Sequence, residues 1–307
     1  MIEVNNISFK YAGQKDLVFD DFSLRLEENN IYGLLGKNGT GKSTLLYLIA
    51  GLLRAKRGTV SFDGIETYKR KAETLQEIFI VPEEFDLPSM TLEQYVRINE
   101  PFYPRFSREV LEACLKDFEL TEQREESRAG STLPSRDGSG RSQLSTDLQL
   151  GALSMGQKKK VFMSFALAAG TKLLLMDEPT NGLDIPSKSQ FRKVVTQHMT
   201  EERTLIISTH QVHDVESLLD HILILSKQRL LLDASVAEIQ QKYTFEYRAA
   251  VTSPNPSCRR GTDEDVLYAE PSLQGNAVIA PRKAGSTETQ INLELLFNAV
   301  NEGRITI

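Results

Sequence analysis

The sequence predicts an α/β fold with a mainly parallel sheet, and three patterns support this prediction. Apolar strands and helical segments alternate from residue 155 to residue 226, as in sheets whose parallel strands are joined by helices. A glycine-rich segment at residues 36–44 separates an apolar run at 31–35 from a helical run at 45–50. Residues 1–26 alternate between polar and apolar side chains, which indicates an additional half-buried antiparallel sheet.

The glycine-rich segment has the spacing G-x-x-x-x-G-K-[ST] of a phosphate loop. Glycines let backbone N–H groups approach a polyphosphate, and the N-terminus of the following helix adds positive partial charge. Lys42 supplies a full positive charge, and Ser43 offers a hydroxyl to a Mg²⁺ ion. The alternative, a glycine-rich turn with a chance Lys-Ser pair, leaves the strand before it and the helix after it unexplained. The expected nucleotide-binding residues are Gly36, Lys37, Asn38, Gly39, Thr40, Gly41, Lys42, Ser43 and Thr44.

Composition limits the functions that this chain can have. Its 307 residues, 40% of them apolar, suffice for one large domain or for one domain with an appendage. The net charge of −6 argues against a broad nucleic-acid-binding surface, so no nucleic acid is expected as a partner. No apolar run reaches the length of about 18 residues that spans a membrane. The N-terminus lacks a signal-peptide pattern, and the two cysteines are expected to be free thiols in a reducing cytosol.

Periodicity and capping signals assign the remaining segments. Short strands are expected at 58–64, which ends in an Asp-Gly turn, and at 78–81, which Pro82 stops. Helices are expected from Thr91, where a capping box begins, and from Ser107. The alternating second half comprises a helix from 155, a strand at 173–176, a helix from 186, a strand at 204–208, a helix from 210 and a strand at 221–225.

Two stretches and the tail lie outside this alternation. Residues 121–148 contain six serines and no aromatic residue, so we expect a flexible insertion there. Residues 249–265 are rich in turn-forming residues and are expected to form a loop. The tail, with strands expected at 266–268 and 276–279 and a helix at 293–300, is predicted to be a small α+β appendage without an assigned ligand.

Four further motifs follow the phosphate loop in a fixed order. Leu153–Gln157 resembles the L-S-G-G-Q signature of ABC ATPases, with Met155 in place of the first glycine of that pattern. The segment 173–178 resembles their Walker B strand with its trailing glutamate, and 181–184 resembles their D-loop. His210, which follows an apolar strand, resembles their switch histidine. The chain is therefore similar to the ABC-type nucleotide-binding domains of P-loop NTPases over about residues 1–240.

The resemblance implies a domain organisation as well as a fold. Residues 1–240 are expected to form the ABC ATPase domain, with an N-terminal antiparallel sheet and a helical subdomain at about 85–120. The flexible insertion at about 121–148 lies within this domain. Residues 241–307 are expected to form the C-terminal appendage, including the loop at about 249–265.

The resemblance also implies roles for the catalytic residues. Asp177 would hold Mg²⁺ opposite Ser43, and Glu178 would orient or deprotonate the attacking water. His210 would contact the γ-phosphate together with Lys42. The alternatives are that Asp177 and Glu178 form a solvated strand end and that His210 is a surface residue or a helix cap.

Other residues are expected to contact the nucleotide from elsewhere in the fold. By the resemblance, Ser154, Gly156, Gln157 and Asp184 would meet the nucleotide that a second subunit binds. Tyr11 would stack on adenine, and the alternative is a strand-end aromatic packed in the core. The lysines at 158–160 are expected to be a solvated first helical turn.

One departure from the family pattern concerns the metal. Glu83 follows Val81-Pro82, where the family normally has a glutamine whose amide reaches Mg²⁺. A carboxylate is also a good ligand for this cation, so Glu83 is a candidate metal ligand that adds negative charge near the γ-phosphate. This charge would slow hydrolysis or alter coupling.

These expectations define an ATPase of the transport class. The chain would bind ATP and Mg²⁺, hydrolyse ATP to ADP and phosphate, and power a separate membrane-spanning subunit from the inner, cytoplasmic face of the membrane. It would act as a homodimer or with a homologous partner, closing around two ATP molecules. The alternatives are a soluble ABC ATPase acting on ribosomes or DNA, and a non-hydrolysing module gated by nucleotide. Phosphate release and copurification of a membrane protein would distinguish them.

Overall fold

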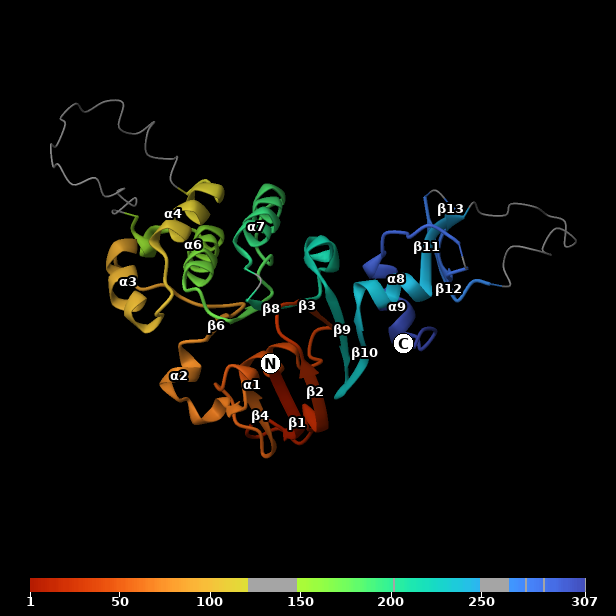
Figure 1. Cartoon of the computed structure of the whole chain (residues 1–307), viewed down its shortest axis with the longest axis horizontal. Helices are drawn as coiled ribbons and strands as arrows, with labels where there is room; N and C mark the ends of the chain where they lie inside the picture. The colour runs from red at the N-terminus through yellow and green to blue at the C-terminus, as the bar shows by residue number, and fades with distance from the viewer. Residues whose placement is uncertain (121–147, 201, 249–264, 274, 284, 307) are drawn as a thin grey trace, which may run out of the picture.

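The computed structural model describes residues 1–120, 148–200, 202–248, 265–273, 275–283 and 285–306 (Figure 1). The expected insertion at 121–148 lies outside the described residues except for Leu148. The expected loop at 249–265 likewise lies outside them except for Asp265.

A six-stranded sheet forms the centre of the molecule, in the order β10-β9-β3-β8-β7-β6. Neighbouring strands are parallel from β9 to β6, and β10 pairs antiparallel with β9 at one edge. Every residue of β7 and β8 is buried, as expected for a parallel sheet covered on both faces. The predicted parallel α/β core is confirmed, whereas β10 was not predicted. The strands are β3 (Ile31–Leu35), β6 (Ile78–Val81), β7 (Leu173–Asp177), β8 (Thr204–Thr209), β9 (His221–Ser226) and β10 (Arg229–Ser235).

The two faces of this sheet pack against different layers, because successive strand residues point to opposite sides. Leu173 and Leu175 of β7 belong to a core shared with the N-terminal sheet and helix α1 (Lys42–Ile49). Leu174 and Met176 belong to a second core shared with the helical layer. Helix α1, which directly follows the phosphate loop, is thus fixed between two sheets.

The N-terminal sheet is antiparallel and has the order β2-β1-β4-β5. Its outer hairpin turns at Asp63 and Gly64, whose φ angles of 49° and 76° fit the two-residue turn predicted from the Asp-Gly pair. The predicted antiparallel sheet is therefore confirmed. Its strands are β1 (Ile2–Phe9), β2 (Phe19–Leu26), β4 (Arg57–Phe62) and β5 (Ile65–Glu66), and the short helices η1 (Thr67–Lys69) and α2 (Ala72–Leu75) lead on to β6.

The helical layer covers the other face of the central sheet (Figure 1). Thr91 begins α3 with the predicted capping box, and the Ser107 hydroxyl caps α4 by accepting the Val110 N–H. The helices of this layer are α3 (Leu92–Asn99), η2 (Glu100–Phe102), α4 (Arg108–Asp117), η4 (Leu150–Ala152), α6 (Met155–Ala168) and α7 (Ile185–His198).

The segment after β8 differs from its prediction. Instead of a helix from His210, the chain forms two single 3₁₀ turns, η5 (Val212–Asp214) and η6 (Glu216–Leu218). Val212, Val215, Leu218 and Leu219 of this connection all pack in the core of the helical layer, so tertiary packing shapes the segment.

The C-terminal segment forms the predicted α+β unit, at the right in Figure 1. Strands β11, β13 and β12 form an antiparallel sheet in that order. Leu293, Leu296 and Val300 of α9 share the hydrophobic core of the helical layer, and the Leu293 N–H donates to Glu216 Oε1 at 2.8 Å. The elements are α8 (Val236–Lys242), β11 (Tyr243–Arg248), β12 (Tyr268–Ser272), β13 (Gly275–Pro281) and α9 (Leu293–Asn301).

We predict that Phe165→Ala lowers the free energy of unfolding by about 3–5 kcal/mol. Phe165 is 1% exposed, and its ring contacts four aromatic rings, so truncation leaves a cavity between the helices and the sheet. Urea unfolding followed by circular dichroism measures the change. Phe102, which is 63% exposed in the same layer, supplies the control Phe102→Ala with an expected change within about 0.5 kcal/mol. Equal changes for the two variants would contradict this prediction.

Candidate nucleotide-binding and catalytic site

The phosphate loop joins β3 to α1 and needs glycine at two positions for different reasons. Gly41 has a φ of 103°, a left-handed conformation that residues with a Cβ rarely adopt. A Cβ at Gly36 would lie 2.6 Å from the Leu225 carbonyl oxygen, so a side chain would collide with strand β9. The loop is thereby held close against the end of the central sheet.

The loop and the first turn of α1 fit a polyphosphate. The N-cap residue Gly41 has no side chain, and in the described structure no side chain caps the N–H groups of the first turn. No atom lies within 4 Å of the position that a Cβ would take at Gly39, so the loop is open there. Free N–H donors beside an open space at a helix N-terminus form an anion-binding site.

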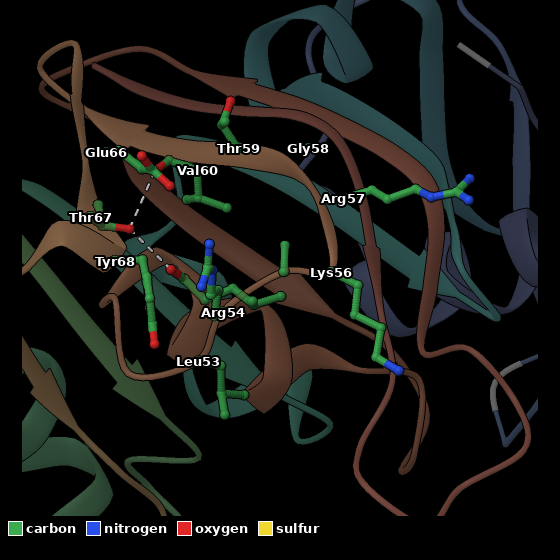
Figure 2. Close-up of a pocket in the computed structure, with 12 residues that line it drawn as sticks. Leu53, Arg54, Lys56, Arg57, Gly58, Thr59, Val60, Glu66, Thr67 and Tyr68 are labelled. Atoms are coloured by element: carbon green, nitrogen blue, oxygen red, sulfur yellow. Dashed lines mark hydrogen bonds between the residues drawn. The ribbon is translucent and has the colours of Figure 1, made fainter.

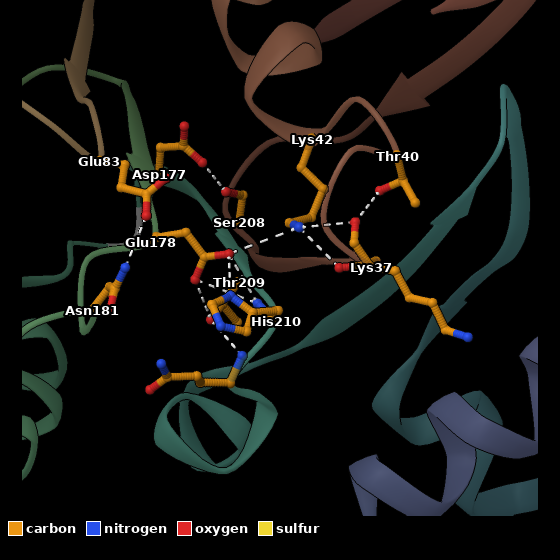
Figure 3. A network of polar contacts seen from close by, with 12 residues as sticks. Lys37, Thr40, Lys42, Glu83, Asp177, Glu178, Asn181, Ser208, Thr209 and His210 are labelled. Carbon is orange, nitrogen blue, oxygen red and sulfur yellow. Dashed lines mark hydrogen bonds and ion pairs between the residues drawn. The ribbon is translucent and has the colours of Figure 1, made fainter.

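The remaining polar loop residues hold the loop in shape. Thr40 donates from its hydroxyl to the Lys37 carbonyl oxygen at 2.9 Å and from its N–H to the same oxygen at 3.3 Å. The Lys37 side chain points away from the network of polar contacts in Figure 3.

Lys42 places its ammonium inside the loop. The side chain is 6% exposed, and Nζ donates to the carbonyl oxygens of Gly36 at 2.8 Å and Lys37 at 3.4 Å. Nζ also lies 3.8 Å from Glu178 Oε1. Burial lowers the pKa of Lys42, and the negative charges of Glu178, Asp177 and Glu83 oppose this shift.

Glu178 is held by the end of the neighbouring strand (Figure 3). Its carboxylate accepts the Thr209 hydroxyl at 3.0 Å and the His210 N–H at 3.0 Å, and His210 Nδ1 lies 2.8 Å from Oε1. Because a carboxylate only accepts, Nδ1 must carry the proton of that contact. The φ of Glu178 is 45°, a conformation that costs about 1–3 kcal/mol in a residue with a Cβ. Strain combined with three contacts is typical of a residue whose placement serves function.

Asp177 lies beside Glu178 and is 1% exposed. It stands opposite Ser208 in the parallel register of β7 and β8, and the Ser208 hydroxyl donates to it. Burial raises the pKa of Asp177, whereas hydrogen bonds from Ser208 and Ser43 lower it in part. In the described parts of the chain, no group of three or more His, Cys, Asp or Glu residues forms a metal centre. The oxygens of Asp177 and Ser43 nevertheless suit Mg²⁺, which takes few protein ligands and completes its shell with phosphate and water.

Glu83 follows β6 and lies near Asp177 in Figure 3. Its Oε1 accepts a hydrogen bond from Asn181 Nδ2 at 2.8 Å. The structure therefore connects Glu83 to the D-loop segment, and its assignment as a metal ligand stays a prediction.

The signature residues begin helix α6. The Ser154 hydroxyl accepts the Gln157 N–H at 3.3 Å, and the Gln157 side chain accepts the Ser154 N–H at 3.0 Å, which forms a capping box. Gly156 lies against the D-loop, since its Cβ position is 3.8 Å from the Gly182 carbonyl oxygen. Among the hydrogen bonds of the described residues, none joins Ser154, Gly156 or Gln157 to the phosphate loop.

Asp184 and Tyr11 lie at two other edges of the site. Asp184 caps α7 by accepting the Ser187 N–H at 3.0 Å, and hydrogen bonds from the Ser187 side chain and backbone hold the pKa of Asp184 below its usual range. The Tyr11 hydroxyl lies 3.0 Å from Thr44 Oγ1, and its ring meets Phe9 edge-on with 5.0 Å between centroids. Tyr11 thus stands beside the phosphate loop with its ring partly packed on the core, and its role in base stacking stays a prediction.

The structure also identifies residues of the site that the sequence prediction missed. Lys159 was expected to be solvated, which is wrong: it is 5% exposed. Its Nζ donates to the carbonyl oxygens of Glu178 at 3.0 Å and Asn181 at 2.8 Å. Helical spacing gives a signal, because Lys159 shares one face of α6 with the buried Met163 and Ala166. Ser208 and Thr209 were missed because their role depends on which strands are neighbours.

A separate hollow of about 530 Å³ lies between β4, η1 and the end of α1 (Figure 2). The buried Thr67 hydroxyl in its wall is satisfied by the carbonyl oxygens of Leu48 and Val60. The charged ends of Lys56 and Arg57 point away from Thr67 in Figure 2. These polar groups do not converge on a ligand position.

Comparisons with known sequences identify relatives of this chain. A family model described as ABC transporter matches residues 19–181, more than half of the chain. The "ABC transporter ATP-binding protein NatA" of Bacillus subtilis is 29% identical over 250 residues, which cover 80% of this chain and 94% of NatA. The "Bacitracin transport ATP-binding protein BcrA" of Bacillus licheniformis is 27% identical over 234 residues, covering 75% of this chain and 68% of BcrA.

Solved structures agree in fold. The "Structure of ATP binding subunit of ABC transporter" has a TM-score of 0.63 at 24% identity and covers 78% of this chain and 92% of that one. A bacterial Atm1-family ABC exporter with ATP bound has a TM-score of 0.61 at 21% identity, over 78% of this chain and 39% of that one. No described helix has the length and apolar character needed to cross a lipid bilayer. The family match, the relatives and the shared fold together show that this chain belongs to the ABC transporter family and has the fold of its ATP-binding proteins.

Proposed function

We propose that this chain hydrolyses ATP as the ATP-binding subunit of an ABC transporter and powers a separate membrane-spanning subunit. The observation that carries the proposal is the Glu178 carboxylate, which Thr209 and His210 hold 3.8 Å from the Lys42 ammonium. In this place Glu178 orients or deprotonates the water that attacks the γ-phosphate. Lys42 and the loop N–H groups neutralise the phosphate charge, which is the main requirement of phosphoryl transfer.

Mg²⁺ completes the proposed site. Ser43 and Asp177 would hold it, with Glu83 as a further carboxylate nearby. When bound, the ion would neutralise charge on the β- and γ-phosphates. The hydrogen bonds from Ser208 and Ser43 keep Asp177 oriented while burial excludes competing water.

A second ATPase subunit would complete the nucleotide contacts. Ser154, Met155 and Asp184 are exposed at the N-termini of α6 and α7, and Met155 is 54% exposed. These helix ends offer N–H donors and positive partial charge to a nucleotide bound by another copy or by a homologue. Gly156 and Gln157 belong to the first turn of α6 and would contact the same nucleotide, and Tyr11 would stack on the adenine.

The membrane-spanning partner would dock on the helical layer. Ile98 of α3 and Phe102 of η2 are 57% and 63% exposed, which is unusual for large apolar side chains that lie close together in the chain. A chain docked there would lie at the inner, cytoplasmic face of the membrane as a peripheral subunit. Copurification of a multi-spanning membrane protein with the tagged chain tests this part of the proposal.

A non-hydrolysing nucleotide-gated module is the second candidate. Glu83 favours it, because an additional carboxylate near Asp177 adds negative charge where the γ-phosphate would lie. A phosphate-release assay with ATP and Mg²⁺ separates the two candidates. Steady turnover supports the ATPase, and nucleotide binding without phosphate release supports the gated module.

We predict that Glu178→Gln lowers the turnover number by about 10²–10⁴ and traps an ATP-bound dimer. The amide keeps the size of the side chain and removes the base, while Lys42 still binds nucleotide. Phosphate release measures turnover, and size-exclusion chromatography with ATP and Mg²⁺ detects the dimer. Glu73→Gln, which changes a carboxylate paired only with the exposed Lys71 among its ion-pair contacts in the described structure, serves as the control. Near-wild-type turnover of Glu178→Gln would refute the catalytic assignment.

We predict that Lys42→Ala weakens ATP binding and abolishes turnover. The substitution removes the full positive charge that lies inside the phosphate loop. Titration with a fluorescent ATP analogue measures affinity. Lys172→Ala controls for the loss of a lysine, because Lys172 is 49% exposed and pairs with Asp63. Unchanged affinity and turnover in Lys42→Ala would show that the loop does not bind the phosphates.

A further inference from the structure

The loop that follows β6 packs along the first turns of α6. The ring of Phe85 lies 4.5 Å from that of Phe162, measured between centroids. Lys158 Nζ lies 3.8 Å from Asp86 Oδ1. One aromatic pair and one ion pair thus hold the loop after β6 against α6, whose N-terminus carries the signature residues.

Lys159 fastens the same helix to the turn that carries Glu178. Its two hydrogen bonds reach the carbonyl oxygens of Glu178 and Asn181, the first and last residues of that turn. The turn itself is closed by the Asn181 N–H, which donates to the Glu178 carbonyl oxygen at 3.1 Å. A single side chain of α6 therefore fixes both ends of the segment between β7 and the D-loop.

Glu83 also contacts this turn, through the Asn181 side chain. Its carboxylate accepts the Asn181 side chain at 2.8 Å, and a cavity of about 170 Å³ is lined by both Glu83 and Lys159. Burial lowers the pKa of Lys159, and the negative charge of Glu83 is the strongest of the effects that oppose this shift. The ammonium and the carboxylate are thus electrostatically linked across Asn181.

The interaction of Lys159 with Glu83 balances negative charge in the site. Asp177 and Glu178 are buried carboxylates, and Glu83 adds a third negative charge beside them. Removing the cation from a buried charged group leaves the opposite charge uncompensated, which is costly. Lys42 would contact the phosphates when nucleotide binds, whereas Lys159 is hydrogen-bonded to the turn.

We propose that Lys159 is a positioning residue that holds the Glu178–Asn181 turn to α6 and compensates the charge of Glu83. The inference rests on the proposed function, in which Glu178 is the base. It means that a carboxylate at position 83 is tolerated because a lysine stands at position 159. It also means that a movement of the N-terminal end of α6 would shift Glu178 through the Lys159 side chain.

A double-mutant cycle tests the proposal on the full-length chain. We expect Lys159→Met to lower kcat by up to about 100-fold with little change in the KM for ATP, because it displaces the base without touching the phosphate loop. In the Glu83→Gln background, where less charge needs compensation, we expect the same substitution to cost at least about twofold less. Lys160→Met is the matched control, because Lys160 donates instead to the Phe118 carbonyl oxygen and Gln190.

Each outcome of the cycle has a definite meaning. A smaller loss in the Glu83→Gln background supports charge compensation, which a purely structural lysine would not show. Equal losses in both backgrounds, or a loss no larger than that of Lys160→Met, would overturn the proposal. If Lys159→Met does not fold, Lys159→Gln takes its place in the same cycle, because it keeps a donor and removes the charge.

Hydrogen exchange separates this proposal from the proposed function. We expect Lys159→Met to accelerate exchange at the amides of Asn181 and Leu183, which close the turn and the D-loop. This measurement does not need hydrolysis, so it remains informative if the parent chain releases no phosphate. Unchanged exchange at these amides would overturn the positioning role even in an active ATPase.

Discussion

The parallel pairing of β7 with β8 is the constraint on which the rest of the site depends. It sets Asp177 opposite Ser208, and the next residues along each strand then bring Glu178 to Thr209 and His210. Both strands are completely buried, so their register is fixed by packing on two faces and not only by backbone hydrogen bonds. A slip of one residue would exchange the faces of every side chain on the strand and separate the carboxylates from their partners.

The layers packed on the two faces of the central sheet position the other parts of the site around these strand ends. The core shared with the N-terminal sheet holds α1, and therefore the phosphate loop, at the carboxyl ends of the strands. The core on the opposite face holds α6, whose Lys159 reaches the turn after β7. The nucleotide side and the signature side of the chain are thus positioned from opposite faces of one sheet, and Glu178 lies where both meet.

Electrostatics within the site is a balance of buried charges. The carboxylates of Asp177 and Glu178 interact electrostatically with the ammonium groups of Lys42 and Lys159, and both lysines are more than nine-tenths buried. Burial lowers the pKa of both lysines and raises that of Asp177, so each buried charge depends on its neighbours to stay ionised. Such an arrangement favours a bound polyphosphate with its cation, because they add charges of both signs at once.

Local sequence determined much of this protein. The phosphate loop, the two capping boxes at Thr91 and Ser154 and the Asp-Gly hairpin follow from short-range chemistry, in which neighbouring residues satisfy each other's backbone groups. The sequence also predicted the parallel strands, because fully buried strands appear as continuous apolar runs.

Local sequence could not predict which residues come into contact across the fold. The contacts of Lys159 with Glu178 and of Glu83 with Asn181 join residues 19 and 98 positions apart. The two 3₁₀ turns that replace the predicted helix after His210 have the same origin, since the core contacts of this segment override its local propensity. Only the tertiary structure decided these features, because burial and charge compensation depend on which segments become neighbours.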